Sequence, residues 1–560
     1  MDAVNRIQGG TAFLSLLADE GVTHMFGNPG TTELPVMDAL GKQTEIPYVL
    51  GLQESVVIGM ADGFGRASGK LTACNVHVAP GLGNAMGAIY NARFTHTPMI
   101  ITAGQHEQGH MLTEPVLYEP LVPIATPLVK WAVEITRLED MPRIVRRAAK
   151  IAMTPPMGPV FLSLPGDVLK DEDGIDLGSA TRIDTRVRPT DEAVSALATR
   201  LIAAKNPAII AGNEIVVCDT LAEAARFAET LGAPALQQTI AYGSHFLSES
   251  PCYIGELSRG QKDIRAALDP YDLLVFVGAE VLRTSTASAV EPMPPHASVV
   301  QIGLDDWEMG KNYHADIAIR ADVRETLRAL IPELERQGGA ALAKLANDRI
   351  AELSGINWTA RNAKAREAAM EKASASPIEP DWLMFNVVDA LPEDAIIVNE
   401  SLTSSRALPH LWPYRDRYNF HGNASGGIGW GLPASLGVQL AHPDRPVVCL
   451  SGDGSAMYSI QALWTAAHLD LPVTFVIANN RSYRILKQRL RVFHDSEAYV
   501  GMDFDKPPID FAGLAESMGV KSERVTEPDA VRPAIDAALA SKGPTLLDVA
   551  LDNTVRALPR

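Results

Sequence analysis

The segment from Val447 to Ser482 constrains the fold more than any other feature of this chain. It contains a buried-type strand that runs into the tripeptide GDG around Asp453, a helical stretch, and a second apolar strand that ends in the pair NN at Asn480. In an open α/β sheet the carboxyl ends of parallel strands meet at one edge, where ligands bind. The segment therefore predicts a parallel sheet with a polar site at that edge.

The residue types in this segment suit a metal diphosphate. Asp453 offers a carboxylate oxygen, Asn480 an amide oxygen and Ser482 a backbone carbonyl. Mg²⁺ prefers octahedral oxygen ligation that substrate phosphates complete. The glycines let backbone N–H groups approach a phosphate, and a following helix N-terminus adds donors. The alternative is a tight strand-to-helix turn followed by an ordinary loop, which a GDG tripeptide alone would favour.

Short β-branched runs alternate with Ala-rich helical segments along the chain, which is the pattern of parallel α/β layers. The sequence predicts an α/β fold with three doubly wound parallel-sheet domains, a usual number for 560 residues. An acidic stretch and a polar helical stretch separate the blocks. The predicted units are a first domain at residues 1–185, a middle domain at 190–340, a linker at 341–377 and a third domain at 378–560.

Charge and cysteine usage exclude several kinds of partner. Acidic residues outnumber basic ones by 67 to 49, a net charge of −18, which argues against nucleic acid or an anionic membrane. The N-terminus is typical of an amphipathic helix rather than a signal peptide, and no long apolar run predicts a membrane span. We therefore expect a cytoplasmic protein. Four cysteines without a CxxC pair predict neither disulfides nor structural zinc: Cys74, Cys218, Cys252 and Cys449.

Several further motifs occur in a fixed order with the GDG segment. They are FGNPGTTELP (Phe26–Pro35), LQES (Leu52–Ser55), NVHVAPGLGNAMGA (Asn75–Ala88), NES (Asn399–Ser401), SGGIGWGLPA (Ser425–Ala434) and GDGSAMYSIQALWTAA (Gly452–Ala467). With these motifs the chain resembles the superfamily of thiamine-diphosphate-dependent decarboxylases and acetohydroxyacid synthases, and within it the benzoylformate decarboxylases. The resemblance extends over nearly the whole length.

This resemblance implies a role for each domain. The first domain would bind the aminopyrimidine of thiamine diphosphate, the third its diphosphate through Mg²⁺, and the middle domain would be mainly structural. The cofactor would lie between the first domain of one subunit and the third domain of another. A homodimer would then be the minimal active unit, and the family is usually tetrameric. An FAD in the middle domain, as in acetolactate synthases, is allowed but not favoured.

The resemblance also implies three catalytic residues. Glu54 would hydrogen-bond the aminopyrimidine and promote removal of the C2 proton of the thiazolium. The alternative is that Glu54 only favours the N-terminus of a helix. His77 matches a histidine that transfers protons, and Thr31 stands where the family has an active-site serine.

The remaining site residues are expected to hold the cofactor. Ile428 would enforce its bent shape, and Leu402 is apolar where a benzoylformate decarboxylase has a hydroxyl group. The predicted cofactor-binding residues are Pro29, Gly30, Asn84, Ser401, Thr403, Gly426, Ile428, Gly454, Ser455, Tyr458 and Tyr483. The predicted metal ligands are Asp453, Asn480 and Ser482.

Two departures bear on the substrate. Ser285 stands at the position of a second catalytic histidine. An aromatic residue that lines the substrate pocket is replaced within Tyr483–Arg491, and the run from Arg481 to Arg491 is cationic. Such a cluster would hold a carboxylate or phosphate of the substrate, and the alternative is a solvated helix face. The acid–base set and the pocket therefore differ from those of benzoylformate decarboxylases.

The predicted reaction is non-oxidative decarboxylation of a small-molecule 2-oxoacid through an ylide and an enamine. Because the same enamine can attack a second carbonyl, such as that of an aldehyde, the alternatives are a carboligase or carbon–carbon lyase, or an acetolactate-synthase-like enzyme. A more distant alternative is an inactive homologue that serves as a partner subunit. The presence of Glu54, Asp453 and Asn480 together argues against an inactive homologue.

Overall fold

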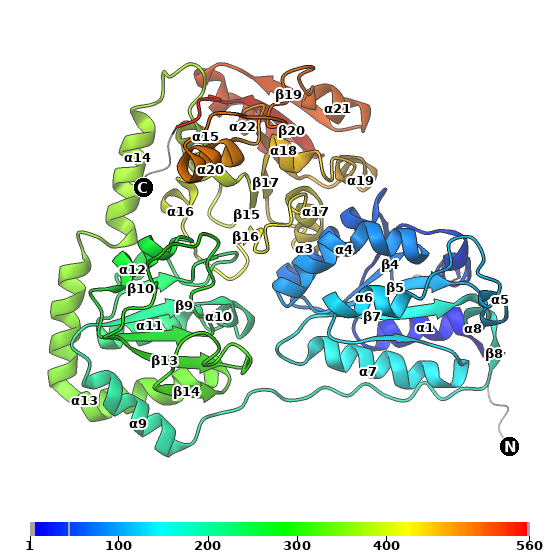
Figure 1. The fold of residues 1–560 in the computed structure, drawn as a ribbon, viewed down its shortest axis with the longest axis horizontal. Coiled ribbons are helices and arrows are strands. Elements are labelled where there is room, and N and C mark those ends of the chain that lie inside the picture. The colour runs from blue at the N-terminus through cyan, green and yellow to red at the C-terminus, as the bar shows by residue number, and fades with distance from the viewer. Residues whose placement is uncertain (1–5, 43–44, 557–560) are drawn as a thin grey trace.

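The computed structural model describes residues 6–42 and 45–556. These residues form three six-stranded sheets, each entirely parallel and flanked by helices (Figure 1). The predicted α/β fold of three parallel-sheet domains is thus confirmed. In the described part of the chain, every helix is too short or too polar to cross a membrane.

The first sheet has the strand order β3-β2-β4-β5-β7-β6. Its strands alternate side chains between two cores: one under α1 and α7, the other under α3 and α4 and shared with the third domain. The strands are β2 (Met25–Gly27), β3 (Tyr48–Leu50), β4 (Thr72–Val76), β5 (Met99–Gln105), β6 (Ala132–Glu134) and β7 (Pro159–Pro165). The helices are α1 (Gly9–Asp19), α2 (Leu34–Gly41), α3 (Glu54–Ser68), α4 (Val78–Phe94), α5 (Gln108–Met111), α6 (Leu121–Ala125), α7 (Met141–Met153) and α8 (Gly166–Lys170). A short antiparallel pair joins β1 (Ile7–Gln8) to β8 (Glu172–Asp173).

The middle sheet has the order β11-β10-β9-β12-β13-β14. Its strands are β9 (Pro207–Ala211), β10 (Ala235–Gln237), β11 (Tyr253–Glu256), β12 (Leu273–Val277), β13 (Ser298–Gly303) and β14 (Ile317–Arg320). Its helices are α9 (Asp191–Ile202), α10 (Asn213–Val217), α11 (Leu221–Leu231), α12 (Gln261–Leu268) and α13 (Val323–Leu353). The central strand β12 is fully apolar, as expected for a strand covered on both faces.

The third sheet has the order β16-β15-β17-β18-β20-β19. The helical stretch predicted after the GDG tripeptide is two short helices, α18 and α19. The strands are β15 (Ile396–Glu400), β16 (Phe420–Gly422), β17 (Val447–Gly452), β18 (Thr474–Asn479), β19 (Lys521–Val525) and β20 (Thr545–Ala550). The helices are α15 (Pro380–Ala390), α16 (Leu408–Leu411), α17 (Gly431–Ala441), α18 (Asp453–Ala456), α19 (Ala462–His468), α20 (Arg484–His494), α21 (Phe511–Ser517) and α22 (Val531–Leu539).

Two extended or helical segments connect the three sheets. Residues 174–190 carry no helix or strand and run as a long strap to α9 (Figure 1). The predicted linker contains the second half of α13, which packs on the middle domain through Leu342 and Ala346. It continues in α14 (Trp358–Met370), where the indole of Trp358 donates to the carbonyl of Pro409 in the third domain. The domain limits themselves remain predictions.

The first and third domains meet where α3 crosses α17. Glycines permit this close approach, since a Cβ at Gly63 would lie 2.2 Å from the Ala434 carbonyl oxygen. A Cβ at Gly437 would lie 1.9 Å from the carbonyl oxygen of Met60. The two outer sheets of one chain are therefore held in a fixed relation by helix packing.

Candidate functional site

The carboxyl edge of the third sheet gathers the predicted metal ligands. Asp453 follows β17 as the first residue of α18, and Asn480 and Ser482 follow β18. All three are buried. The Asn480 Oδ1 accepts the Ser482 hydroxyl at 2.9 Å, and the Asp453 Oδ1 accepts the Gly454 N–H at 2.8 Å. The chain thus brings a carboxylate, an amide and a hydroxyl to one place.

The second carboxylate oxygen of Asp453 is buried and has no hydrogen-bond partner among the described residues. Burial raises the pKa of this carboxyl to about 6, although the backbone N–H groups of Gly454, Arg481 and Ser482 act in the opposite direction. A buried, unpartnered carboxylate oxygen is costly unless a cation or donor meets it. The donor set therefore fits a hard divalent cation such as Mg²⁺.

Tyr483 closes one side of this edge. A Cβ at Gly454 would lie 2.5 Å from the Tyr483 ring, so only glycine fits there. The ring is itself held edge-on by Phe504, with centroids 4.5 Å apart. Ser455 is buried beside Asp453, whereas Tyr458 is exposed.

The loop after β15 brings the hydroxyl groups predicted to bind the diphosphate. The Ser401 hydroxyl donates to the Asn399 Oδ1 at 2.9 Å, and Thr403 lies in the 3₁₀ turn η4 (Leu402–Ser404). The Nε of Arg484 donates to the Thr403 hydroxyl at 3.3 Å. Leu402 is partly exposed beside them.

Residues after β16 form the loop of the SGGIG motif. Gly426 has a φ of 84°, a left-handed conformation that glycine adopts without strain. The side-chain amides of Asn91 and Asn423 both donate to the Gly427 carbonyl, at 2.9 and 2.7 Å. Because Asn91 lies on α4 of the first domain, this contact fixes the loop that carries Ile428.

The corresponding edge of the first sheet carries Glu54. It is the first residue of α3, and the preceding Gln53 caps the helix by accepting the N–H of Ser55 at 2.6 Å. The Glu54 side chain is buried, and its Oε2 accepts the amide of Asn84 at 3.1 Å. Asn84 is exposed on α4 and thus reaches both Glu54 and solvent.

His77 follows β4 directly and is paired with a carboxylate that the sequence did not reveal. Its Nδ1 lies 2.8 Å from the Oε2 of Glu33, which is buried. Glu33 also accepts the backbone N–H of Gly30 at 2.8 Å and of Gly104 at 2.7 Å. This carboxylate therefore orients the imidazole and the FGNPG loop, in which Thr31 and Pro29 are exposed.

The two edges lie on different sides of one chain. Helix α5, which follows β5 of the first sheet, lies at the right end of Figure 1, whereas α20, which follows β18, lies at the upper left. Glu54 and His77 are thus brought together at one edge, and Asp453, Asn480 and Ser482 at the other.

Comparison with known proteins decides the family. Three family models match: the N-terminal thiamine pyrophosphate (TPP) binding domain at residues 7–116, the central domain at 194–330 and the C-terminal TPP binding domain at 403–549. This chain belongs to the thiamine pyrophosphate enzymes. The resemblance read from the motifs is thereby confirmed.

Relatives of this thiamine pyrophosphate enzyme span its whole length. It is 33% identical over 543 residues to a benzoylformate decarboxylase of Pseudomonas aeruginosa, covering 96% of this chain and 98% of the relative. It is 27% identical over 558 residues to the large subunit of acetolactate synthase isozyme 1 of Escherichia coli, covering 99% and 96%. A solved structure of the Rhodococcus jostii thiamine diphosphate-dependent 4-hydroxybenzoylformate decarboxylase matches with a TM-score of 0.85 and 31% identity, covering 98% and 100%.

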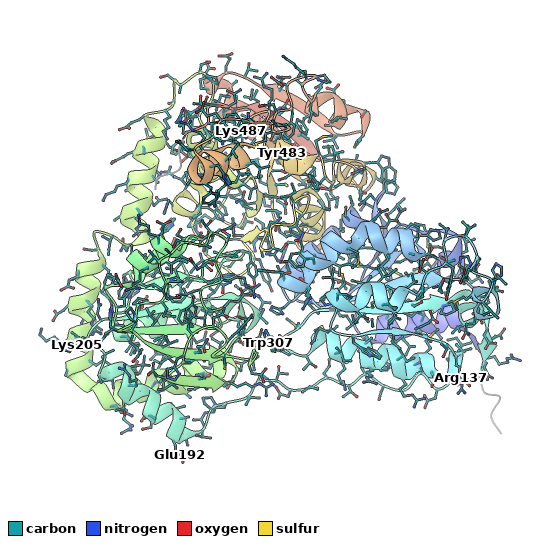
Figure 2. All side chains as sticks on the ribbon, viewed as in Figure 1. Arg137, Glu192, Lys205, Trp307, Tyr483 and Lys487 are labelled. Carbon is teal, nitrogen blue, oxygen red and sulfur yellow. The ribbon has the colours of Figure 1, made fainter. Side chains whose placement is uncertain are left out.

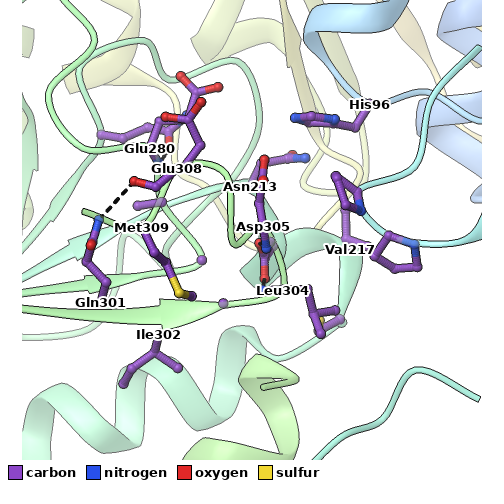
Figure 3. Close-up of a pocket in the computed structure, with 18 of the residues that line it drawn as sticks. His96, Asn213, Val217, Glu280, Gln301, Ile302, Leu304, Asp305, Glu308 and Met309 are labelled. Carbon is purple, nitrogen blue, oxygen red and sulfur yellow. Dashed lines mark hydrogen bonds between the residues drawn. The ribbon is translucent and has the colours of Figure 1, made fainter. Parts of the chain in front are cut away.

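A separate cavity lies at the carboxyl edge of the middle sheet, where His96 of the first domain also lines it (Figure 3). Glu214 reaches into the loop after β13 and accepts the N–H groups of Leu304 and Asp305, at 2.8 and 3.2 Å. Burial raises the pKa of Glu214 to about 7 and of Glu280 to about 7. Because Glu214 already takes these backbone donors, the edge presents carboxylates where a diphosphate would need N–H groups. Polar residues that line the cavity include His96, Asn213, Glu214, Glu280, Asp305 and Glu308.

Proposed function

We propose that this thiamine pyrophosphate enzyme catalyses Mg²⁺-dependent, non-oxidative decarboxylation of a 2-oxoacid. The observation that carries the proposal is the buried Asp453 oxygen without a partner, on an edge that also presents Asn480 and Ser482. Relatives over the full chain length include a benzoylformate decarboxylase, which supports decarboxylation. When bound, the cofactor supplies a carbanion equivalent at C2 and an electron sink for the carboxylate's electrons.

The third domain holds the cofactor in this proposal. Asp453 and Asn480 would hold Mg²⁺ through side-chain oxygens and Ser482 through its carbonyl, and the hydroxyl groups of Ser401 and Thr403 would contact the diphosphate. Gly454 and Ser455 open the path for backbone N–H groups, and Tyr458 and Tyr483 border it. This arrangement binds an anion in a chain of net charge −18, because the metal and the N–H groups supply the positive charge.

The first domain supplies proton transfer. Glu54 would hydrogen-bond the aminopyrimidine ring, and the Asn84 amide that donates to its Oε2 would orient the carboxylate. His77 donates or accepts a proton near the reacting carbon, and Glu33 fixes which ring nitrogen faces the substrate. Gly426 and Ile428 of the third domain would position the pyrimidine.

The active unit in this proposal is a homodimer, and the full assembly a homotetramer. The supporting observation is that the edge with Glu54 and the edge with Asp453 lie on different sides of one chain (Figure 1). A second copy is needed to bring one edge of each kind together. Exposed apolar side chains near both edges, among them Leu34, Leu52 and Tyr458, suit such an interface.

A panel of 2-oxoacids, with and without an acceptor aldehyde, tests the reaction. Release of CO₂ and a free aldehyde supports the decarboxylase. A ligated product as the main outcome favours the carboligase or acetolactate-synthase-like reaction, which the relationship to acetolactate synthase keeps as the second candidate.

Calorimetric titration with thiamine diphosphate and Mg²⁺ tests the cofactor separately from the substrate. Tight binding only when both are present supports the metal-bridged site. Absence of binding would contradict the proposed enzymatic function and favour an inactive homologue that serves as a partner subunit.

The carboxylates at the middle-domain edge disfavour the diphosphate of a flavin dinucleotide. We therefore expect the visible absorbance spectrum of the purified protein to show no flavin band. A stoichiometric flavin band would contradict this expectation.

A further inference from the structure

Three arginines meet at the seam between the middle and third domains. Arg259 lies between β11 and α12, Arg406 follows η4, and Arg489 lies on α20. The Nη1 of Arg489 donates to the Thr286 hydroxyl at 2.7 Å, across the domain boundary. The Nη2 of Arg406 donates to the Oε1 of Gln488 at 3.0 Å. We call Arg259, Arg406 and Arg489 the arginine cluster.

The middle-domain side of the seam is a small hydrogen-bonded unit. The Arg259 carbonyl accepts the backbone N–H groups of Ser285 and Thr286, at 3.1 and 3.3 Å. Thr286, which accepts the hydrogen bond from Arg489, is therefore itself bonded to the backbone of Arg259. The two side chains come from different domains and are close enough for the charge of Arg489 to act on the Arg259 guanidinium.

Within residues 6–42 and 45–556, no member of the arginine cluster forms a direct ion pair with a carboxylate. Two carboxylates act on the cluster without touching it, Glu256 on Arg259 and Asp381 on Arg406. Both have other partners. Glu256 accepts the Tyr414 hydroxyl at 2.9 Å, and Asp381 pairs with Lys372. The cluster thus carries excess positive charge in an acidic protein.

The charges in the cluster affect one another. Arg259 and Arg406 are exposed, yet desolvation by neighbouring protein atoms lowers the pKa of each guanidinium. The positive charge of Arg489 lowers the pKa of both further. Mutual repulsion of this kind is relieved when an anion binds between the groups.

The other cations of α20 have structural partners. Arg484 donates to the carbonyl of Asp552 at 2.8 Å and to the hydroxyl of Ser404 at 2.9 Å. Lys487, labelled in Figure 2, forms a close ion pair with Asp503. These contacts fasten α20 to the loop after β15, so the helix presents Arg489 from a rigid base.

The position of the cluster connects it to the candidate site. Arg406 leaves the same loop that carries Ser401 and Thr403, and α20 begins directly after Tyr483. We infer that the arginine cluster is a subsite for a second anionic group, a carboxylate or a phosphoryl group, at the far end of the substrate. This inference rests on the proposed function, since it names the class of 2-oxoacid. Arginine forks suit such groups because they bind two oxygens at once.

Substrate pairs of equal length test the subsite. We compare kcat/KM for 2-oxoadipate, for its ω-phosphonate counterpart and for 2-oxoheptanoate, whose far end is uncharged. For Arg489→Gln we expect the ratio of charged to neutral substrate to fall about tenfold to a hundredfold, the usual value of a charge-assisted hydrogen bond. Arg489→Lys restores part of it, because the charge returns without the fork. An unchanged ratio overturns the subsite.

Arg491→Gln is the matched control. Arg491 lies two residues further along α20 and contacts Glu497 and the Val555 carbonyl. We expect this variant to keep the wild-type ratio. Equal thermal melting of the Arg489→Gln and Arg491→Gln proteins excludes a folding defect.

Binding of unreactive anions separates the subsite from the proposed reaction. The protein loaded with thiamine diphosphate and Mg²⁺ is titrated calorimetrically with glutarate and with inorganic phosphate. Binding that Arg489→Gln loses supports the subsite even where no 2-oxoacid reacts, in which case only the proposed reaction fails. Absence of binding of both probes, or equal binding by the variant, overturns the subsite. The probe that binds shows whether the group is a carboxylate or a phosphate.

Discussion

The first and third domains share one topology and carry different chemistry. Numbered in chain order within each domain, both sheets run 2-1-3-4-6-5, whereas the middle sheet runs 3-2-1-4-5-6. In both outer sheets the strand order reverses between the first and third strands, which is where open α/β sheets bind ligands. At that point the first domain places His77 after β4, and the third places Asp453 after β17.

The difference between the two edges is one of residue type. The first edge has titratable side chains paired with one another, such as Glu33 with His77. The third edge has oxygen atoms without donors, such as the Asp453 Oδ2. In the proposed function, a shared fold therefore divides proton transfer and cofactor binding between two copies of the same architecture.

The largest effect is expected at the third edge. Asp453→Asn removes the carboxylate charge from the proposed metal site. We expect kcat/KM to fall on the order of ten-thousandfold, since a metal ion stabilises charge by several kcal/mol. Steady-state kinetics at saturating cofactor measures this. Asp444→Asn is the control, because Asp444 is exposed before the other end of β17. Loss of activity below tenfold would contradict a metal site at Asp453.

At the first edge, Glu54→Gln keeps the shape and the hydrogen bond to Asn84 but removes the charge. We expect kcat to fall about a hundredfold to a thousandfold, as for a lost acid–base group, while cofactor binding remains. Kinetics and calorimetry together distinguish this from the Asp453 variant. Glu139→Gln, an exposed residue of the same domain, should behave as wild type. If Glu54→Gln also lost cofactor binding, the first edge would serve cofactor binding as well as proton transfer, which contradicts the proposed difference between the two edges.

A smaller effect tests how His77 is positioned. A Cβ at Gly30 would lie 2.1 Å from the His77 Nδ1, so Gly30→Ala must displace the imidazole or the loop. We expect kcat to fall about tenfold to a hundredfold, the usual consequence of a displacement near 1 Å. Gly41→Ala meets no atom within 4 Å and serves as the control. Equal kcat in both variants would show that His77 is not held by this contact.

The smallest effect concerns the middle domain. The pKa of Glu214 is raised to about 7 by burial, so its stabilising contribution is present below the unfolded pKa near 4.5 and is lost as the pH rises through 7. We expect Glu214→Gln to gain about 2 kcal/mol of stability relative to wild type between pH 5 and 8. Thermal melting at both pH values measures this. Glu192→Gln, an exposed residue labelled in Figure 2, should show no such gain. A pH-independent difference would contradict the raised pKa.

Sequence reading succeeded where the signal is local. The GDG tripeptide and the NN pair predicted the edge that holds Asp453, because strand ends and the residues after them are adjacent in the chain. LQES likewise predicted Glu54 at the start of a helix, which α3 confirms.

Contacts between distant segments could not be read in the same way. Glu33 meets His77 across 44 residues, and its only local signal is an acid three residues after Gly30. The contact of Arg489 with Thr286 spans 203 residues and depends on how two domains pack. Neither pairing follows from periodicity, since both require the relative position of separate elements.

The central claim is that each site combines the first domain of one subunit with the third domain of its partner. Co-expression of the Glu54→Gln and Asp453→Asn chains tests it most directly. In a mixed dimer one site carries both changes and the other carries none, so random pairing should restore about a quarter of wild-type activity although each variant alone is inactive. Activity of the mixture no higher than that of the separate variants would place both edges of each site in a single chain and contradict the claim.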